Sequence, residues 1–344
     1  MLLIEPLRLL RPQDAAKLAF QAAYGAEHLL PDSGAGLEEA RARFLEEFEA
    51  CEKTPGPPLE RISPDTARAG LPAWKEAGLP PEWLFGLFLG SARAGARPDA
   101  EEALAHHLAD IGGAAYASLL PFSHGEWREY VRGYAGGPVR HSGEYREKER
   151  PAYRVLTGPF AAAAEILYGL RGLRAATVGI DGRAASGKTS VADALADALG
   201  TEPVRMDDFF LPPDLRTPGR LAEPGGNVHY ERFLEEAAGK LAAREALAYR
   251  PFCCRAMGFG PAKTIGPAPF MVVEGAYSHH PIFGGYLDLR VFGDVDGRTQ
   301  FRRIARRNGP AACETYRAEW VPMEERYLAA FGIREKAHMS FGGA

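Results

Sequence analysis

The sequence predicts an α/β domain with a parallel sheet, preceded by a mostly α-helical domain. After about residue 171, short apolar strands alternate with helices, and this alternation is typical of a parallel sheet with helical crossovers. Before about residue 175, no run of β-branched residues is long enough for a sheet. With 344 residues the chain is about twice the usual domain size, so we expect two domains, 1–168 and 169–344.

The first domain is expected to consist of helices whose apolar residues recur every three or four positions. These helices are predicted at residues 37–50, 82–89, 98–112 and 161–170, and the apolar helix 82–89 is expected to be buried on all sides. The segment 141–154 is dense in polar groups that could bind an anion. We interpret this segment either as a contact between the domains or as a second binding site.

In the second domain, strands and helices follow one another along the chain. Strands are predicted at residues 175–181, 203–206, 270–273 and 289–295. Helices are predicted at residues 190–199, 230–247 and 298–308. The first of these helices is expected to end at Gly200, because glycine readily adopts the left-handed conformation that closes a helix.

The overall composition excludes several classes of protein. The hydrophobic fraction is 46% and the charged fraction 25%, which suits a folded globular protein rather than a disordered or fibrous one. A net charge of −4 gives no basic surplus for nucleic acid, and no stretch reaches the roughly 18 apolar residues of a membrane helix. The four cysteines lack the spacing of a zinc site or a disulfide framework. We expect a cytoplasmic protein with a small-molecule substrate and neither nucleic-acid nor membrane partners; a homo-oligomer is compatible with the sequence.

Residues 182–189, GRAASGKT, fit the pattern GxxxxGK[ST] between a predicted strand and a predicted helix. In such a loop small residues let backbone N–H groups converge on phosphate oxygens, and the helix N-terminus adds positive potential. Lys188 would reach the β- and γ-phosphates, and the Thr189 hydroxyl would bind Mg²⁺. The alternative is a chance glycine-rich turn. The motif predicts a three-layer P-loop NTPase domain whose nucleotide contacts are Gly182, Arg183, Ala184, Ala185, Ser186, Gly187, Lys188, Thr189 and Ser190.

Carboxylates follow two of the predicted strands. Asp207 and Asp208 come after strand 203–206, and Glu274 follows the continuous apolar strand 270–273. The carboxyl ends of parallel strands border the crevice where open α/β sheets bind ligands. An acid there can accept the proton of an attacking hydroxyl or lie beside Mg²⁺. Alternatively, the aspartates belong to a solvated turn and Glu274 caps a neighbouring helix.

The helix 298–308 carries a dense group of arginines. Arg302 and Arg306 are separated by one turn, as are Arg303 and Arg307, and each like-charge pair costs an isolated helix roughly 0.2–0.5 kcal/mol. Such cationic density suits a lid that closes on a triphosphate. The alternative is a solvated basic face.

Together these motifs resemble the uridine kinase-like branch of the P-loop small-molecule kinases, which includes uridine, nicotinamide riboside and pantothenate kinases and phosphoribulokinase. The resemblance runs from about Thr177 to about Tyr327. It rests on five stretches: GRAASGKT at 182–189, MDDFF at 206–210, GGNVHYERF at 225–233, VVEG at 272–275 and FRRIARR at 301–307.

The resemblance implies roles for individual residues. Asp207 resembles the general base of the family, and Glu274 resembles its magnesium-associated acid. ATP and Mg²⁺ are the implied cofactors, with Lys188 and Thr189 in their usual roles. Arg302, Arg303 and Arg306 resemble the lid residues. On the acceptor side the expected residues are Asp208, His229, Tyr230 and Arg250.

Two departures concern the substrate. Members that bind ribonucleosides carry an aspartate where this chain has His229, and often another where it has Cys253. A histidine cannot act as an anionic acceptor for two ribose hydroxyls. The phosphoryl-transfer residues are therefore present while the ribose-reading residues are altered, which argues against an unmodified nucleoside as the substrate.

The leading hypothesis is an ATP- and Mg²⁺-dependent kinase that phosphorylates a hydroxyl of a small metabolite. A second hypothesis makes the P-loop domain a nucleotide-gated switch whose N-terminal domain binds a partner. A third is a kinase-like protein that binds ATP without transferring phosphate, suggested by His229 and Cys253.

Overall fold

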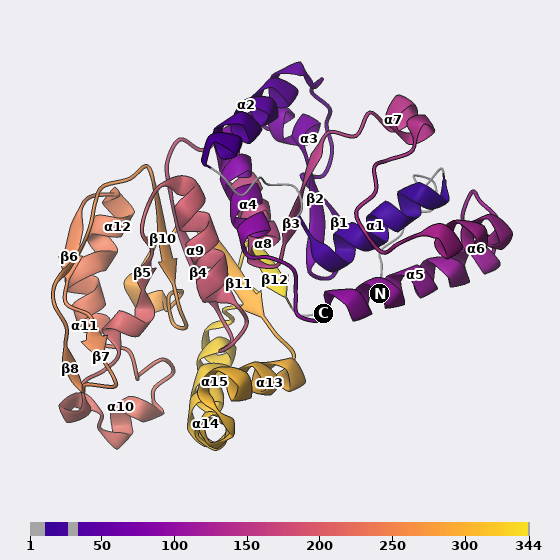
Figure 1. The fold of residues 1–344 in the computed structure, drawn as a ribbon. Helices are drawn as coiled ribbons and strands as arrows, with labels where there is room; N and C mark the ends of the chain where they lie inside the picture. Colours follow the sequence, from indigo (N-terminus) through magenta and orange to yellow (C-terminus); the bar gives the residue numbers. More distant parts are fainter. Residues whose placement is uncertain (1–10, 27–33, 343–344) are drawn as a thin grey trace. The chain divides into compact units, whose positions relative to one another are not determined.

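The computed structural model describes residues 11–26 and 34–342 and divides the chain into two units, Met1–Arg171 and Gly172–Ala344 (Figure 1). Each unit has its own hydrophobic core. In the first, the core includes Leu18 and Phe20 of one helix, Leu104 and Ile111 of another, and Trp127. In the second, the core lies around the strands and helices that follow residue 203.

The helices of the first unit are α1 (Pro12–Tyr24), α2 (Gly34–Ala50), α3 (Leu71–Glu76), α4 (Pro81–Arg93), α5 (Ala100–Tyr116), α6 (His124–Gly133), α7 (Gly143–Glu149) and α8 (Pro159–Gly169). The four predicted helices are confirmed as α2, α4, α5 and α8. The expectation that the second of them is buried on all sides is wrong, because Glu82 and Gly86 of α4 are exposed. Only the face with Leu84, Leu87 and Phe88 is buried.

The expectation of no sheet before residue 175 is also wrong. Strands β1 (Leu59–Ser63), β2 (Thr66–Gly70) and β3 (Tyr153–Thr157) form an antiparallel sheet in the order β1-β2-β3. The central strand reads Thr-Ala-Arg-Ala-Gly, with little β-branched content. Its Ala67 and Ala69 are fully buried. Strand formation here depends on burial and pairing with a distant segment rather than on local propensity, which the sequence pattern alone does not reveal.

The polar segment 141–154 bonds to α1 within the same unit. Ser142 donates from its backbone N–H and its hydroxyl to the Asp14 carboxylate, at 2.8 and 2.7 Å. His141 lies between Asp14, at 3.3 Å from Nδ1, and the Tyr153 hydroxyl, at 2.7 Å from Nε2. Burial lowers the pKa of His141. These hydrogen bonds join the segment to α1, so the polar groups of His141 and Ser142 already have partners within the first unit.

The second unit is built on a five-stranded sheet of order β12-β11-β4-β10-β5, and every pair in it is parallel. Its strands are β4 (Ala176–Gly182), β5 (Val204–Arg205), β10 (Phe270–Glu274), β11 (Leu289–Asp294) and β12 (Met339–Gly342). The four predicted strands are confirmed, although β5 is only two residues long. The edge strand β12 was not predicted, because its four residues, Met-Ser-Phe-Gly, include no β-branched side chain and end in glycine.

The order of the strands reverses direction at β4. From β4 the chain goes to β5 on one side of the sheet and, after β10, returns to β11 on the other side. The carboxyl end of β4 is therefore the topological switch point, where open parallel sheets bind their ligands. The predicted phosphate loop begins at this end.

The helices of the second unit are α9 (Lys188–Leu199), α10 (Pro218–Ala222), α11 (Tyr230–Phe233), α12 (Gly239–Ala243), α13 (Gly297–Asn308), α14 (Pro310–Thr315) and α15 (Val321–Phe331). Helix α9 packs on β4 and β10 and ends at Gly200, as predicted. Figure 1 shows α13, α14 and α15 grouped together. No helix in the described ranges is both long and apolar enough to cross a membrane.

The predicted helix 230–247 is wrong at its end. The helical segment stops at Ala243, because Arg244 takes a left-handed conformation with φ 59°. Leu247 instead begins β6 (Leu247–Tyr249), which pairs antiparallel with β9 (Lys263–Ile265). A second hairpin joins β7 (Phe252–Cys253) and β8 (Gly258–Phe259). Leu247 is buried in this pairing, so its apolar character serves a strand rather than a helix.

Candidate active site

The phosphate loop connects β4 to α9 through backbone conformations that require small residues. A Cβ on Gly182 would lie 2.1 Å from the Gly293 carbonyl oxygen, and its φ is +137°, so only glycine fits. Ala185 and Gly187 also have positive φ, of 59° and 97°. The N-terminus of α9 faces this loop, and a helix N-terminus attracts anions. The local geometry therefore suits phosphate binding.

Two cationic side chains contact the loop from different elements. Lys188 Nζ donates to the Arg183 carbonyl oxygen at 3.2 Å, so the lysine folds back along the loop. Arg303 of α13 donates to the Ala185 carbonyl oxygen at 3.0 Å. Both cations therefore lie beside the backbone that would receive phosphate.

The two residues predicted to bind the metal, Thr189 and Glu274, lie in contact. The Thr189 hydroxyl donates to a Glu274 carboxylate oxygen at 3.2 Å, and Arg205 donates to the other oxygen at 3.0 Å. Burial raises the pKa of Glu274, while Lys188 lowers it. Within the described residues, no group of three or more His, Cys, Asp or Glu side chains could hold a metal. Mg²⁺ commonly takes one or two protein oxygens together with phosphate and water, so this hydroxyl–carboxylate pair fits such an ion.

The adjacent acids Asp207 and Asp208 lie in different surroundings. Asp207 is accessible to solvent although protein surrounds it closely, and desolvation raises its pKa; Lys188 and Arg307 oppose that shift. Asp208 instead accepts a hydrogen bond from the Tyr249 hydroxyl at 2.8 Å, and it raises the pKa of that tyrosine further than burial alone. Asp207 is therefore the acid available for chemistry near the phosphate loop, while Asp208 is fixed to a neighbouring strand.

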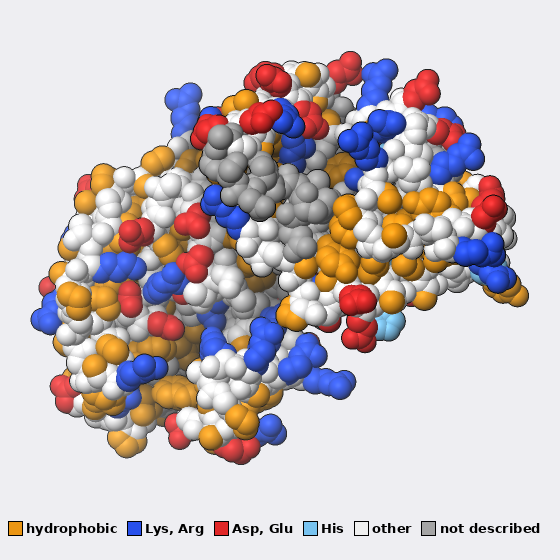
Figure 2. All heavy atoms as spheres, in the orientation of Figure 1, with side chains coloured by type: hydrophobic (Ala, Val, Ile, Leu, Met, Phe, Trp, Pro, Cys, Tyr) orange, Lys and Arg blue, Asp and Glu red, His pale blue; other side chains and the backbone are white. Residues whose placement is uncertain are grey.

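The predicted lid arginines lie on one exposed helix but do not act alike. Figure 2 shows Lys and Arg side chains gathered over the region of α13. Arg303 contacts the phosphate loop, as described above. Arg302 donates to a threonine hydroxyl one turn back on its own helix, and Arg306 forms no hydrogen bond or ion pair within the described part of the chain. Arg307, which was not among the predicted site residues, acts on Asp207.

The predicted acceptor-side residues are engaged in local contacts. His229 is the N-cap of α11, and its Nδ1 lies 3.2 Å from Glu231. The Tyr230 hydroxyl donates to Glu223 at 2.9 Å. Arg250 donates to two backbone carbonyls of the β8 segment. Arg250 and Tyr249 also line an open cavity of about 490 Å³.

Sequence reasoning missed Asp181, a fully buried acid at the end of β4. Its carboxylate accepts four hydrogen bonds: from the backbone N–H groups of Gly182, Tyr277 and His279, and from the Tyr327 hydroxyl at 2.7 Å. It therefore joins the start of the phosphate loop to the segment after β10 and to α15. An acid inside the apolar strand ATVGIDG is the signal that could have singled it out.

We expect Asp181→Asn to destabilise the second unit by about 2–4 kcal/mol, because an amide retains one acceptor and turns its N–H₂ toward backbone donors. Urea unfolding monitored by circular dichroism measures the change. Asp197→Asn, at an exposed position on α9, is the matched control and should unfold within about 0.5 kcal/mol of wild type. Equal stability of the two variants would contradict the role assigned to Asp181.

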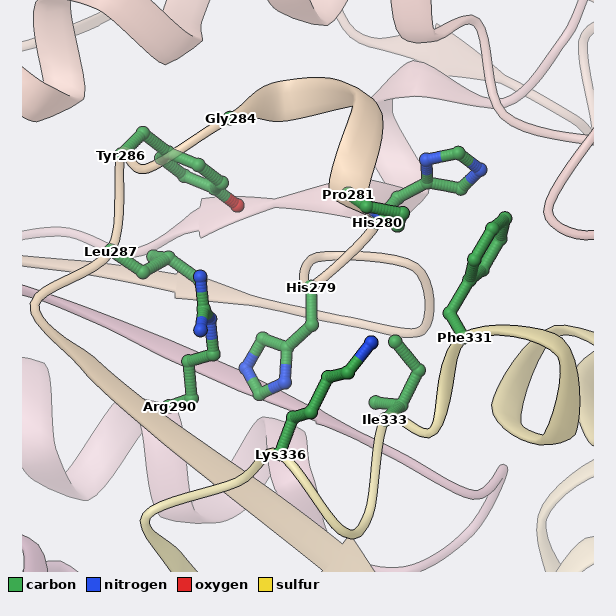
Figure 3. A pocket seen from close by; sticks show the side chains of 10 residues that line it. All are labelled: His279, His280, Pro281, Gly284, Tyr286, Leu287, Arg290, Phe331, Ile333 and Lys336. Carbon is green, nitrogen blue, oxygen red and sulfur yellow. The ribbon is translucent and has the colours of Figure 1, made fainter.

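A separate cavity of about 220 Å³ lies in the second unit, and no phosphate-loop residue lines it. Figure 3 shows His279 between Arg290 and Lys336 in this cavity. His279 Nε2 donates to the Gly179 carbonyl oxygen, 3.0 Å away; since a carbonyl only accepts, Nε2 is the protonated ring nitrogen. Burial lowers the pKa of His279.

The strand order, the strand–loop–helix at the switch point and the flanking helices define the second unit as a P-loop NTPase α/β fold. A comparison with protein-family models finds no match. No curated protein matches the sequence either.

Solved structures similar to this chain include two proteins described as kinases. One is a possible uridine kinase from Bacillus stearothermophilus, with 18% identity and a TM-score of 0.41, covering 53% of this chain and 96% of that chain. The other is described as a fructose transport system kinase from a Silicibacter species, with 22% identity and a TM-score of 0.41, covering 53% and 97%.

Proposed function

We propose that the second unit is an ATP- and Mg²⁺-dependent phosphotransferase that phosphorylates a hydroxyl of a small metabolite. The observation that carries the proposal concerns Asp207. This acid is accessible, desolvation raises its pKa, and the charge of Lys188 in the phosphate loop acts on it and opposes that rise. A nucleotide-binding protein that transfers phosphate to no acceptor needs no base for an acceptor hydroxyl. A kinase needs one, because the acceptor hydroxyl must be aligned and must lose its proton.

The remaining residues support the same reaction. The loop backbone and Lys188 would hold the β- and γ-phosphates, while Arg303 lies where it could neutralise charge on the transferred group. Thr189 and Glu274 would hold Mg²⁺, which supplies charge neutralisation and orientation for the phosphates. The raised pKa of Asp207 brings this base closer to neutral pH, where proton transfer from the acceptor is most efficient.

The proposal is tested by an ADP-release screen over hydroxyl-bearing metabolites, with thermal-shift measurements in the presence and absence of ATP and Mg²⁺. We expect ADP release that depends on both Mg²⁺ and one class of acceptor. Acceptor-independent hydrolysis that requires a protein partner would instead support a nucleotide-gated switch. Tight ATP binding with no turnover on any acceptor would support a kinase-like protein without transferase activity.

The acceptor is expected to bear a phosphate, carboxylate or other anionic group rather than a free ribose diol. His229 and Cys253 stand where related nucleoside kinases have acids, and His229 is occupied by helix capping and by Glu231. A site without these acceptors leaves ribose hydroxyls unpaired, which weakens binding. Competition assays of uridine and cytidine against anionic sugars and hydroxy acids measure this preference. Efficient phosphorylation of uridine that is lost in His229→Ala would contradict it.

A further inference from the structure

A glutamate on α15 is buried beside the phosphate loop. Glu324 is only 5% exposed, and its Oε2 accepts a hydrogen bond from the Ala184 backbone N–H at 2.7 Å. The next residue, Glu325, differs: it pairs with Arg183 at 2.6 Å, and its side chain is 42% exposed. Of these two neighbouring acids, Glu324 is therefore the one enclosed by protein.

The charged and titratable groups around Glu324 come from several elements. They are Lys188 at the start of α9, Asp181 of β4, Glu325 of α15 and Tyr277 in the segment after β10. The nearby Arg183 is already paired with Glu325 and with Asp294, at 2.6 Å to each. Lys188 is accordingly the cation whose charge acts on Glu324.

These groups set the protonation of Glu324 near neutral pH. Burial is the largest cause and raises its pKa to about 7; Asp181 and Glu325 raise it as well. Lys188 and the Ala184 N–H lower it, because both favour the ionised carboxylate. In the free protein this carboxyl therefore exchanges its proton within the physiological range.

A bound triphosphate would change this balance in one direction. It would bring several negative charges to the loop that Glu324 contacts, and it would engage Lys188, the cation that favours the ionised form. This inference rests on the proposed nucleotide site. We propose that Glu324 is a proton-linked positioning residue. It holds the phosphate loop through Ala184 and takes up a proton from solvent when a nucleoside triphosphate binds. The carbonyl oxygen of the neutral carboxyl can still accept the Ala184 N–H, so the loop remains held in both states.

The coupling between proton uptake and nucleotide binding determines how nucleotide affinity changes with pH. Because the triphosphate complex binds more protons than the free protein, affinity falls as pH rises through the pKa of Glu324, by at most about tenfold per pH unit. The same acid affects stability without nucleotide. Its pKa in the fold, about 7, lies above the ordinary value, so its stabilising contribution is present at acidic pH and is lost as pH rises through about 7.

The test is isothermal titration calorimetry with the Mg²⁺ complex of the non-hydrolysable analogue β,γ-imido-ATP, at pH 7.5 in HEPES and in Tris. The two buffers differ in ionisation enthalpy, so the difference in binding heat reports the number of protons taken up. We expect between about half and three-quarters of a proton for wild type and a clear decrease in Glu324→Gln. Glu319→Gln, which removes the same charge at an exposed position, should match wild type.

The pH profile distinguishes this role from a merely structural one. Between pH 7 and 8.5 the affinity of wild type should fall more steeply than that of Glu324→Gln, and the comparison cancels any titration of the nucleotide itself. Binding with equal proton uptake in the two proteins would overturn the proposal alone. Absence of any binding heat would overturn the nucleotide site as well.

If the Glu324→Gln variant does not fold, the test depends on the affinity of wild type alone. An affinity that stays constant between pH 7 and 8.5 would then overturn the proposal. If the variant folds, thermal melting gives a readout without nucleotide. Wild type should lose melting temperature relative to Glu324→Gln as pH rises from 6 to 8, and parallel curves would also contradict the assignment.

Discussion

Replacing Lys188 by alanine is expected to abolish turnover, lowering kcat by at least about 10²–10³-fold. The lysine amino group folds back to the Arg183 carbonyl and acts on Asp207, Glu274 and Glu324, so these three acids near the loop share its charge. Its loss removes the cation that would follow the β- and γ-phosphates as charge develops on them. Initial rates of ADP release under saturating acceptor measure the effect.

The control for this variant is Lys240→Ala on α12, which removes an exposed lysine outside the phosphate loop. Its rate should equal that of wild type. Thermal melting should show that both variants remain folded, since Lys188 makes a single hydrogen bond to the backbone. Near-normal activity of Lys188→Ala would show that the nucleotide binds elsewhere.

What could be predicted from the sequence is what depends on neighbouring residues. The phosphate loop is a local motif, and its glycines are required by close backbone approach, as at Gly182 against Gly293. The strands β4, β10 and β11 are mostly apolar because both faces of a parallel sheet are buried. Such signals lie within a few positions of one another, so pattern and composition reveal them.

What could not be predicted depends on residues far apart in the chain. Three of the donors to Asp181 come from Tyr277, His279 and Tyr327, about a hundred residues or more away. Glu324 reaches the phosphate loop from α15 by the same kind of contact. No local spacing distinguishes these acids from exposed ones. The β1–β3 sheet was missed for a related reason, since its central strand pairs with a segment about ninety residues later.

The register of the acid pair was uncertain from sequence, because two adjacent aspartates share one motif. Their contacts now separate them. The Asp208 carboxylate accepts from the Tyr249 hydroxyl, which ties it to β6. Asp207 faces Lys188 and Arg307, which belong to the phosphate loop and to α13. The difference gives each position its own expected phenotype.

Asp207→Asn is therefore expected to lower kcat by about 10²–10⁴-fold with little change in nucleotide affinity, because a positioned base acts on the acceptor proton and not on the bound phosphates. Asp208→Asn should affect stability more than kcat, since it weakens one hydrogen bond worth about 1.5–3 kcal/mol when the acceptor is charged. Single-turnover rates and calorimetric nucleotide affinities separate these effects. A larger loss of kcat in Asp208→Asn would place the base one residue later.

An equal loss of nucleotide affinity and kcat in Asp207→Asn would instead indicate that this acid holds Mg²⁺ rather than the acceptor hydroxyl. A metal ligand contributes to nucleotide binding before any proton moves, so its loss would weaken both steps.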